Sequence, residues 1–178
     1  MKKANLLWID LEMTGLDPVK DRIIEVGVIA TDWRLNEVAR YTAAIKVNPR
    51  LAKRRMTGDF WEKNMAVREA LFEASQTSGR VVRTVENELI DFLKKNFDMK
   101  QPIYLAGNSV WNDRQFIERQ WSRLNNLLHY RMLDVTAWKL VFENHFRTKI
   151  NKPEIHRALD DIEGSIAELK LYMNRIKL

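Results

Sequence analysis

The sequence predicts one α/β domain, residues 1–178, built on a mixed β-sheet with flanking helices. Two observations predict it. Three stretches rich in Val, Ile and Leu follow one another near the N-terminus with short connections, which favour an antiparallel meander. Beyond them, helical patterns alternate with short apolar stretches. The chain has 178 residues, 46% of them hydrophobic and 30% charged, so it can bury a full core.

The N-terminal third reads as three strands and two turns. Residues 5–12 are an apolar run that ends in acidic residues, and 14–18 carries the Gly and Asp-Pro pattern of a turn. Residues 21–31 are rich in Ile and Val and are expected to form the second strand. A hairpin connection at 33–36 then leads to a third strand at 41–47.

The pattern becomes helical from about Met56 to Phe97. Val85, Leu89 and Leu93 recur there at four-residue steps, as one face of an amphipathic helix requires. Residues 102–110 return to strand character and end in a Gly-Asn-Ser loop.

The C-terminal part is expected to be mainly helical. Helices are predicted over 113–124, 136–146 and 158–175, with a short strand or helix entry at 130–135. Residues 149–154 form a polar break before the last helix.

Composition limits the possible partners and environment. Thirty Lys and Arg against 24 acidic residues give a net charge of +6, which favours polyanion partners such as nucleic acid. The absence of cysteine excludes disulfides and thiolate chemistry and fits a reducing cytoplasm. There is no apolar stretch of membrane-spanning length and no signal peptide, so we expect a cytoplasmic protein with no membrane partner.

Two carboxylates stand at the end of the first predicted strand. Successive side chains of a strand alternate between its faces, so Asp10 and Glu12 point the same way. Two anions side by side repel each other unless a cation lies between them, and Mg²⁺ or Mn²⁺ accepts such oxygen ligands. The alternative is a strand that ends in solvated carboxylates.

Further acidic residues occur far along the chain. Asp113 lies near a predicted helix start, where it is either part of a site or a helix N-cap. His156, Asp160 and Asp161 precede or begin the last helix, where acidic residues are also favourable for the helix itself. Residues four apart share a helix face, so a helical His156 would pair with Asp160.

In this order, these residues resemble the histidine-bearing DEDD 3′→5′ exonucleases, whose third motif is His, four residues, Asp. That spacing selects Asp161 and requires His156 to lie on the loop before the helix. Four stretches resemble those of the oligoribonuclease family in particular: WIDLEMTGLDPVKDRIIEVGVIATD, LAGNSVWNDRQFI, HYRMLDVTAWKL and HRALDDIEGSIAELKLY. The resemblance implies an RNase H-like fold, in which parallel strands join the meander.

The resemblance also implies a mechanism. Asp10, Glu12, Asp113 and Asp161 would hold two divalent ions, Mg²⁺ or Mn²⁺, and His156 would be the general base that deprotonates the attacking water. The expected reaction is 3′→5′ cleavage of very short single-stranded RNA to 5′-mononucleotides.

Substrate-binding residues and a homodimer follow from the same resemblance. Leu16 and Trp61 match a hydrophobic wedge that stacks bases, although both are also ordinary core residue types. Tyr130 matches a residue that the second subunit adds to the neighbouring site. Ser109, Arg131 and Thr136 match the region that binds the 5′ phosphate, although Arg131 is equally typical of a solvated surface.

The segment after Trp61 departs from the family, because Ala66 stands where typical members have a histidine. Glu69 lies in the same segment and would repel a phosphate if it faced the cleft. Two alternatives therefore stay open: an exonuclease acting on longer RNA or on DNA ends, and a non-catalytic nucleic-acid-binding homologue. A basic structural protein without an active site would leave the acidic residues unexplained.

Overall fold

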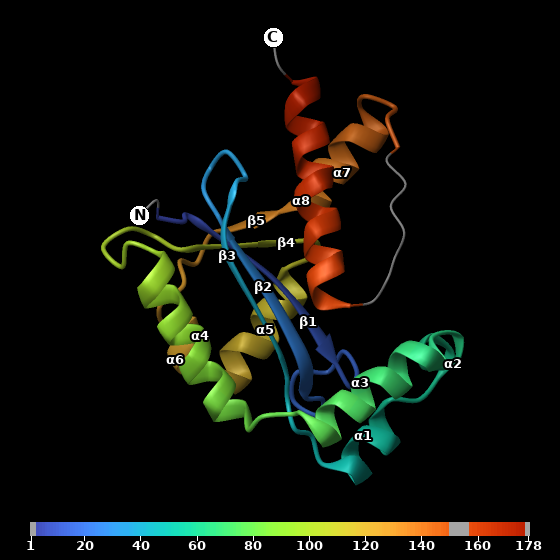
Figure 1. Cartoon of the computed structure of the whole chain (residues 1–178). Coiled ribbons are helices and arrows are strands. Elements are labelled where there is room, and N and C mark those ends of the chain that lie inside the picture. The colour runs from blue at the N-terminus through green and yellow to red at the C-terminus, as the bar shows by residue number, and fades with distance from the viewer. Residues whose placement is uncertain (1–2, 150–156, 177–178) are drawn as a thin grey trace.

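A computed structural model describes residues 3–149 and 157–176 of the chain. Its centre is a five-stranded sheet in the order β3-β2-β1-β4-β5 (Figure 1). β1 pairs with β2 and β2 with β3 in antiparallel register, whereas β1–β4 and β4–β5 are parallel, so the expected mixed sheet is confirmed. The strands are β1 Leu6–Met13, β2 Ile23–Thr31, β3 Glu37–Ala44, β4 Tyr104–Gly107 and β5 Met132–Asp134.

Helices cover both faces and one end of this sheet (Figure 1). They are α1 Pro49–Arg55, α2 Asp59–Lys63, α3 Met65–Thr77, α4 Val82–Asn96, α5 Trp111–Gln120, α6 Ser122–Asn125, α7 Val135–Asn144 and α8 Ala158–Arg175. Three predicted boundaries were wrong. The third strand runs over Glu37–Ala44 rather than 41–47, and helical structure already begins at Pro49. The helix predicted over 113–124 is two helices that meet at Trp121.

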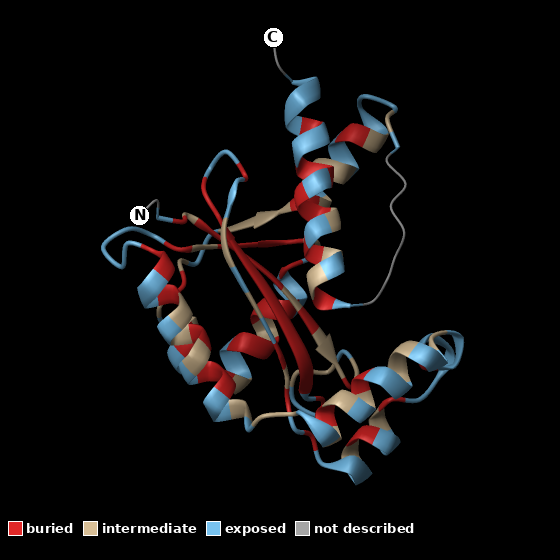
Figure 2. Cartoon of the chain, viewed as in Figure 1, coloured by how far each residue is buried: buried red, intermediate tan, exposed pale blue. Residues whose placement is uncertain are grey.

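Side-chain alternation along β1 assigns residues to the two faces of the sheet. Leu7, Ile9 and Leu11 pack in the core cluster shared with α4 and α5, whereas Leu6 and Trp8 pack with α8. The buried residues accordingly form a continuous band along the central strands, with helices on either side (Figure 2). The even-numbered residues that follow Trp8 therefore emerge on the face that α8 covers.

A smaller cluster lies where α1, α2 and α3 meet the sheet, and it buries Ile24, Ala52, Trp61 and Leu71. The Asn48 side chain caps α1, since it accepts hydrogen bonds from two backbone N–H groups of the first turn. Within the described part of the chain, no helix combines the length and the apolar character needed to cross a membrane.

Candidate active site

Three carboxylates converge at the end of β1. One ligand oxygen from each of Asp10, Glu12 and Asp161 can be chosen so that all three lie within 4.8 Å of one another. Asp10 and Glu12 continue the β1 face that packs against α8, and Asp161 lies in the first turn of that helix. Asp161 is 151 positions from Asp10 and 149 from Glu12 in the sequence, and they meet because α8 lies across β1.

The structure places Asp161 rather than Asp160 in this group. α8 begins at Ala158, and Arg157 is its N-cap residue. His156 itself lies outside the described residues, so its role as general base stays a prediction.

Asp113 approaches the same strand from the other side. β4 pairs with β1 only as far as Trp8, so the backbone N–H of Leu11 has no strand partner on that edge. It instead donates a 2.9 Å hydrogen bond to Oδ1 of Asp113 from α5. Among the described residues, Asp113 is not a member of the converging group, but it holds the strand segment between Asp10 and Glu12.

Burial raises the pKa of two of these carboxyl groups, and neighbouring negative charges add to the shift. Burial, followed by the charges of Glu25 and Asp161, raises the pKa of Glu12 to about 7. Burial also raises the pKa of Asp113 to about 7, against the hydrogen bond from Leu11. Such values mark a place where ionised carboxylates need a compensating cation.

The donor set fits a hard divalent cation. All three converging groups offer carboxylate oxygens, the ligands that Mg²⁺ and Mn²⁺ prefer, and none offers sulfur or imidazole. A bound cation would offset the repulsion that raises the pKa of Glu12.

A cavity of about 580 Å³ opens beside Glu12, within the size range of small-ligand sites. Both predicted wedge residues line it: Leu16 is 81% exposed, whereas Trp61 is only 5% exposed and belongs to the cluster under α1. Phe60 and Arg54 also line this cavity, and sequence reasoning did not single out either residue.

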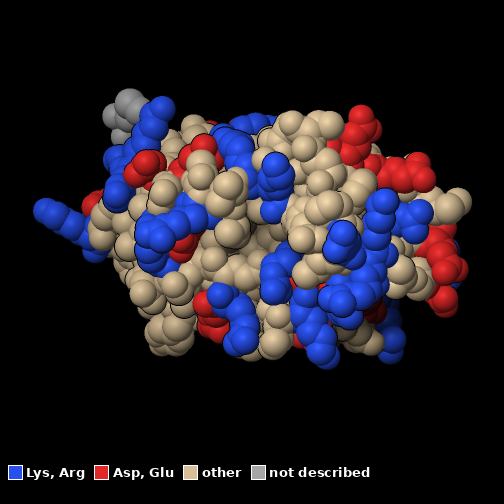
Figure 3. All heavy atoms as spheres, turned by 90° about the horizontal axis from the view of Figure 1, so that it is seen from below, with Lys and Arg blue, Asp and Glu red and all other residues tan. Residues whose placement is uncertain are grey.

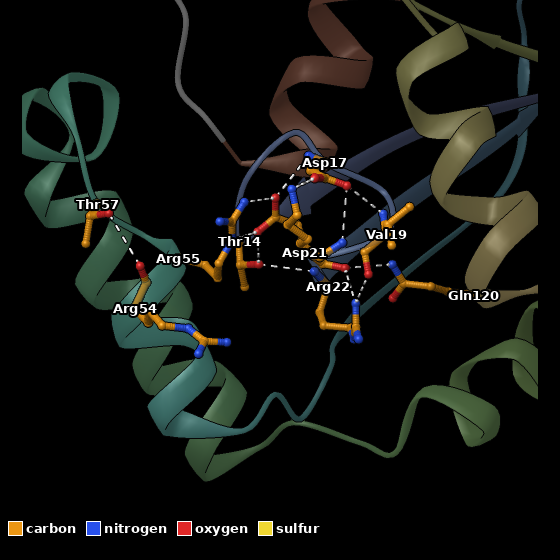
Figure 4. Close-up of polar contacts among 10 residues, drawn as sticks. Thr14, Asp17, Val19, Asp21, Arg22, Arg54, Arg55, Thr57 and Gln120 are labelled. Atoms are coloured by element: carbon orange, nitrogen blue, oxygen red, sulfur yellow. Dashed lines mark hydrogen bonds and ion pairs between the residues drawn. The ribbon is translucent and has the colours of Figure 1, made fainter.

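The loop that carries Leu16 is fixed by an ion pair at its base (Figure 4). Asp21 is fully buried, and its carboxylate accepts hydrogen bonds of 2.7 and 2.8 Å from the Arg55 guanidinium of α1. The hydroxyl of Thr14 and the backbone N–H of Asp17 donate to the same carboxylate. α1 therefore holds the turn after β1 in place.

Two of the predicted phosphate-binding residues are joined beyond the ends of β4 and β5. The backbone N–H of Ser109 donates to Oγ1 of Thr136 at 2.8 Å and to the carboxylate of Asp134 at 3.0 Å. Ser109 has a positive φ of 48°, a strained conformation that these bonds hold.

Arg131 and Tyr130 lie at the opposite end of β5. The guanidinium of Arg131 lies 5.4 Å from the centre of the Tyr130 ring, and Tyr130 is 70% exposed. In the described part of this chain, no hydrogen bond joins Arg131 to Ser109 or Thr136.

Sequence reasoning missed two residues beside the acidic group. Glu25 stands directly opposite Glu12 in the β1–β2 register, and its carboxylate pairs with Arg157 at 2.8 Å. An acidic residue inside the apolar stretch RIIEVGVIA was the available signal. By contrast, Glu69 lines a different cavity, between α1 and α3, and not the cavity beside Glu12.

Positive charge gathers near the cavity. α1 has a basic last turn, Lys53 to Arg55, and no acidic residue in its first turn. Seen from below, Lys and Arg side chains cluster over the end of the molecule where α1 lies, beside a hollow (Figure 3). An anionic strand is attracted to this face.

Comparison with known proteins places this fold among the exonucleases. The family model described as Exonuclease matches residues 7–169. The zinc-bound form of an E. coli ExoI–ssDNA complex has a TM-score of 0.70 at 16% identity, covering 98% of this chain and 41% of that one. Exonuclease I from Methylocaldum szegediense has a TM-score of 0.70 at 17% identity, covering 96% of this chain and 40% of that one. The chain thus spans about two-fifths of these structures, which share its RNase H-like fold.

Relatives of higher identity narrow the class. The oligoribonuclease of Francisella tularensis subsp. tularensis (strain WY96-3418) is 37% identical, covering 97% of this chain and 96% of its own length. The oligoribonuclease of Dichelobacter nodosus (strain VCS1703A) is 39% identical, covering 98% of this chain and 96% of its own length. The chain belongs to the oligoribonuclease family of exonucleases.

Proposed function

We propose that this chain is a 3′→5′ exoribonuclease that degrades very short RNA oligomers to 5′-mononucleotides. The observation that carries the proposal is the convergence of Asp10, Glu12 and Asp161 beside a cavity, in a chain that matches oligoribonucleases along its length. Two divalent ions, Mg²⁺ or Mn²⁺, would bind there, with Asp113 acting through water molecules.

Each residue has a separate task in this proposal. The three converging carboxylates bind the cations, which when bound stabilise the charge that develops on the attacked phosphate. Asp113 fixes β1 through Leu11, and so keeps Asp10 and Glu12 in register. His156 accepts the proton of the attacking water, since an imidazole with an ordinary pKa near 6.5 suits that task at neutral pH.

The substrate would lie across the end of β1. Leu16 presents an exposed apolar side chain from the cavity wall, against which a base can pack. Ser109 and Thr136, which are hydrogen-bonded to each other, would bind the terminal phosphate in this arrangement. Arg131 and Tyr130, at the other end of β5, would serve the site of a second subunit, so we propose a homodimer that acts in the cytoplasm.

Cleavage of labelled oligomers tests the proposal. RNA of two, five and twenty-four nucleotides and the matched DNA, each 5′-labelled, are incubated with Mg²⁺, Mn²⁺ or a chelator, alongside the Asp113→Ala variant. Rapid metal-dependent loss of the two-nucleotide RNA supports an oligoribonuclease. Preferred trimming of the longest RNA or of DNA would instead favour the alternative exonuclease. Binding without cleavage, equal in the variant, would indicate a binding module.

A further inference from the structure

The first turn of α8 lies unusually close to β2. Gly27 faces α8, and a Cβ added to it would lie 2.9 Å from both the Cβ and the carbonyl carbon of Ala158. No side chain can stand between strand and helix at this point, so the start of α8 rests directly on the β2 backbone. Asp161 follows within one turn.

Glu25, two residues before Gly27 on the same face of β2, binds this helix end. Its side chain is 7% exposed. The carboxylate accepts hydrogen bonds from the Arg157 guanidinium at 2.8 and 3.3 Å, and from the backbone N–H of Ala158 at 3.3 Å. Arg157 is the N-cap residue of α8 and makes no side-chain cap of its own. A carboxylate from the sheet thus caps the helix in its place.

This contact connects to the acidic group through one helical hydrogen bond. The backbone N–H of Asp161 donates to the carbonyl oxygen of Arg157 at 3.0 Å. A movement of Arg157 away from Glu25 therefore moves the turn that carries Asp161.

We infer that Glu25 and Arg157 are positioning residues that hold Asp161 against Asp10 and Glu12. The inference rests on the proposed function, because it assumes that these three carboxylates bind a divalent cation. In this inference the Glu25–Arg157 ion pair across the β2–α8 contact, and not α8 alone, sets the geometry of that cation site.

Positioning and simple charge predict opposite results for the loss of Arg157. Removing the Arg157 guanidinium makes the surroundings of Glu12 more negative. A purely electrostatic role of Arg157 therefore predicts that its loss tightens the binding of a divalent cation. Loss of the clamp instead lets Asp161 move, which predicts weaker binding. Residues that orient metal ligands typically contribute about 10–100-fold to metal affinity or activity.

Mn²⁺ binding to the purified protein separates these effects. Mn²⁺ is titrated into the wild type, Arg157→Gln and Arg40→Gln, and the concentration of free Mn²⁺ is measured by electron paramagnetic resonance. Arg40 is the matched control, because it forms a 2.7 Å ion pair with Glu163 between the sheet and the same helix, with both side chains solvent-exposed. We expect Arg157→Gln to raise the Mn²⁺ dissociation constant at least tenfold and Arg40→Gln to change it less than twofold. Unchanged or tighter binding in Arg157→Gln would overturn the inference.

A double-mutant cycle tests whether the two residues act together. Glu25→Gln and Arg157→Gln should each raise the Mn²⁺ dissociation constant. The dissociation constant of the double variant should be no higher than the higher of the two single-variant values. Fully multiplicative losses would show that the residues act independently and would overturn the inference.

Hydrogen exchange keeps the inference separate from the proposed function. In metal-free protein, Arg157→Gln should speed amide exchange in the turn that carries Asp161, whereas Arg40→Gln should not. Equal exchange in all three proteins would refute positioning even if the enzyme cleaves RNA. A wild type that binds no Mn²⁺ but shows this exchange difference would refute the proposed metal site and leave the clamp in place.

Discussion

Replacing Glu12 by Gln removes a carboxylate charge that destabilises the metal-free folded protein. Burial and two neighbouring carboxylates raise the pKa of Glu12 from 4.5 to about 7. Because each pKa unit corresponds to about 1.4 kcal/mol, the ionised side chain costs the metal-free fold about 3 kcal/mol.

The size of this effect depends on pH. Below pH 4.5, Glu12 is protonated in both the folded and the unfolded chain, and no penalty exists. Between pH 4.5 and 7 the unfolded chain releases the proton while the folded chain keeps it, so the free energy of unfolding falls. Above pH 7 the full penalty is present, and Glu12→Gln should be more stable than the wild type by about 3 kcal/mol.

Thermal unfolding in the presence of a chelator measures this difference. At about 2–4 °C per kcal/mol for a chain of this size, the variant should melt roughly 6–12 °C above the wild type at pH 8, and close to it at pH 4. Adding Mg²⁺ at pH 8 should narrow the gap, because a cation bound to the wild type offsets the same charge. A difference in melting temperature that does not change with pH would refute the conclusion that the ionised Glu12 carboxylate destabilises the fold.

Three further changes test other parts of the structure. Arg55→Ala leaves the buried Asp21 without its cation and should lower the free energy of unfolding in denaturant titrations. Arg54→Ala, which breaks no ion pair with a described residue, should change it little. His156→Ala should reduce turnover roughly 10²–10⁴-fold in single-turnover assays while Mn²⁺ binding stays the same, and unchanged turnover would remove His156 from the mechanism. Leu16→Ser should raise KM for a dinucleotide roughly tenfold without moving the melting temperature, since this side chain is 81% exposed, and an unchanged KM would argue against base packing there.

The sequence was informative where a local pattern determines the structure. Alternation along β1 places Asp10 and Glu12 on one face, whatever that strand pairs with. The apolar stripe of the last helix predicted residues 158–175, and α8 has these bounds. The choice of Asp161 over Asp160 came from family resemblance, because it depends on where the helix starts.

Features that depend on distant contacts were not predictable in this way. α1 has only Ala52 buried, so its residues show no apolar stripe, and the helix was missed. Glu25 and Arg157 are 132 positions apart, and only the packing of α8 against β2 brings them together. Likewise, an isolated tryptophan in a sequence does not reveal whether its ring is in the core, as that of Trp61 is.

Anomalous diffraction from a crystal soaked in Mn²⁺ is the most direct test of the metal site. We expect a strong peak bounded by the carboxylate oxygens of Asp10, Glu12 and Asp161, and its loss in Asp161→Asn crystals. A wild-type map with no peak between these oxygens, or with Mn²⁺ bound only elsewhere on the chain, would contradict this expectation.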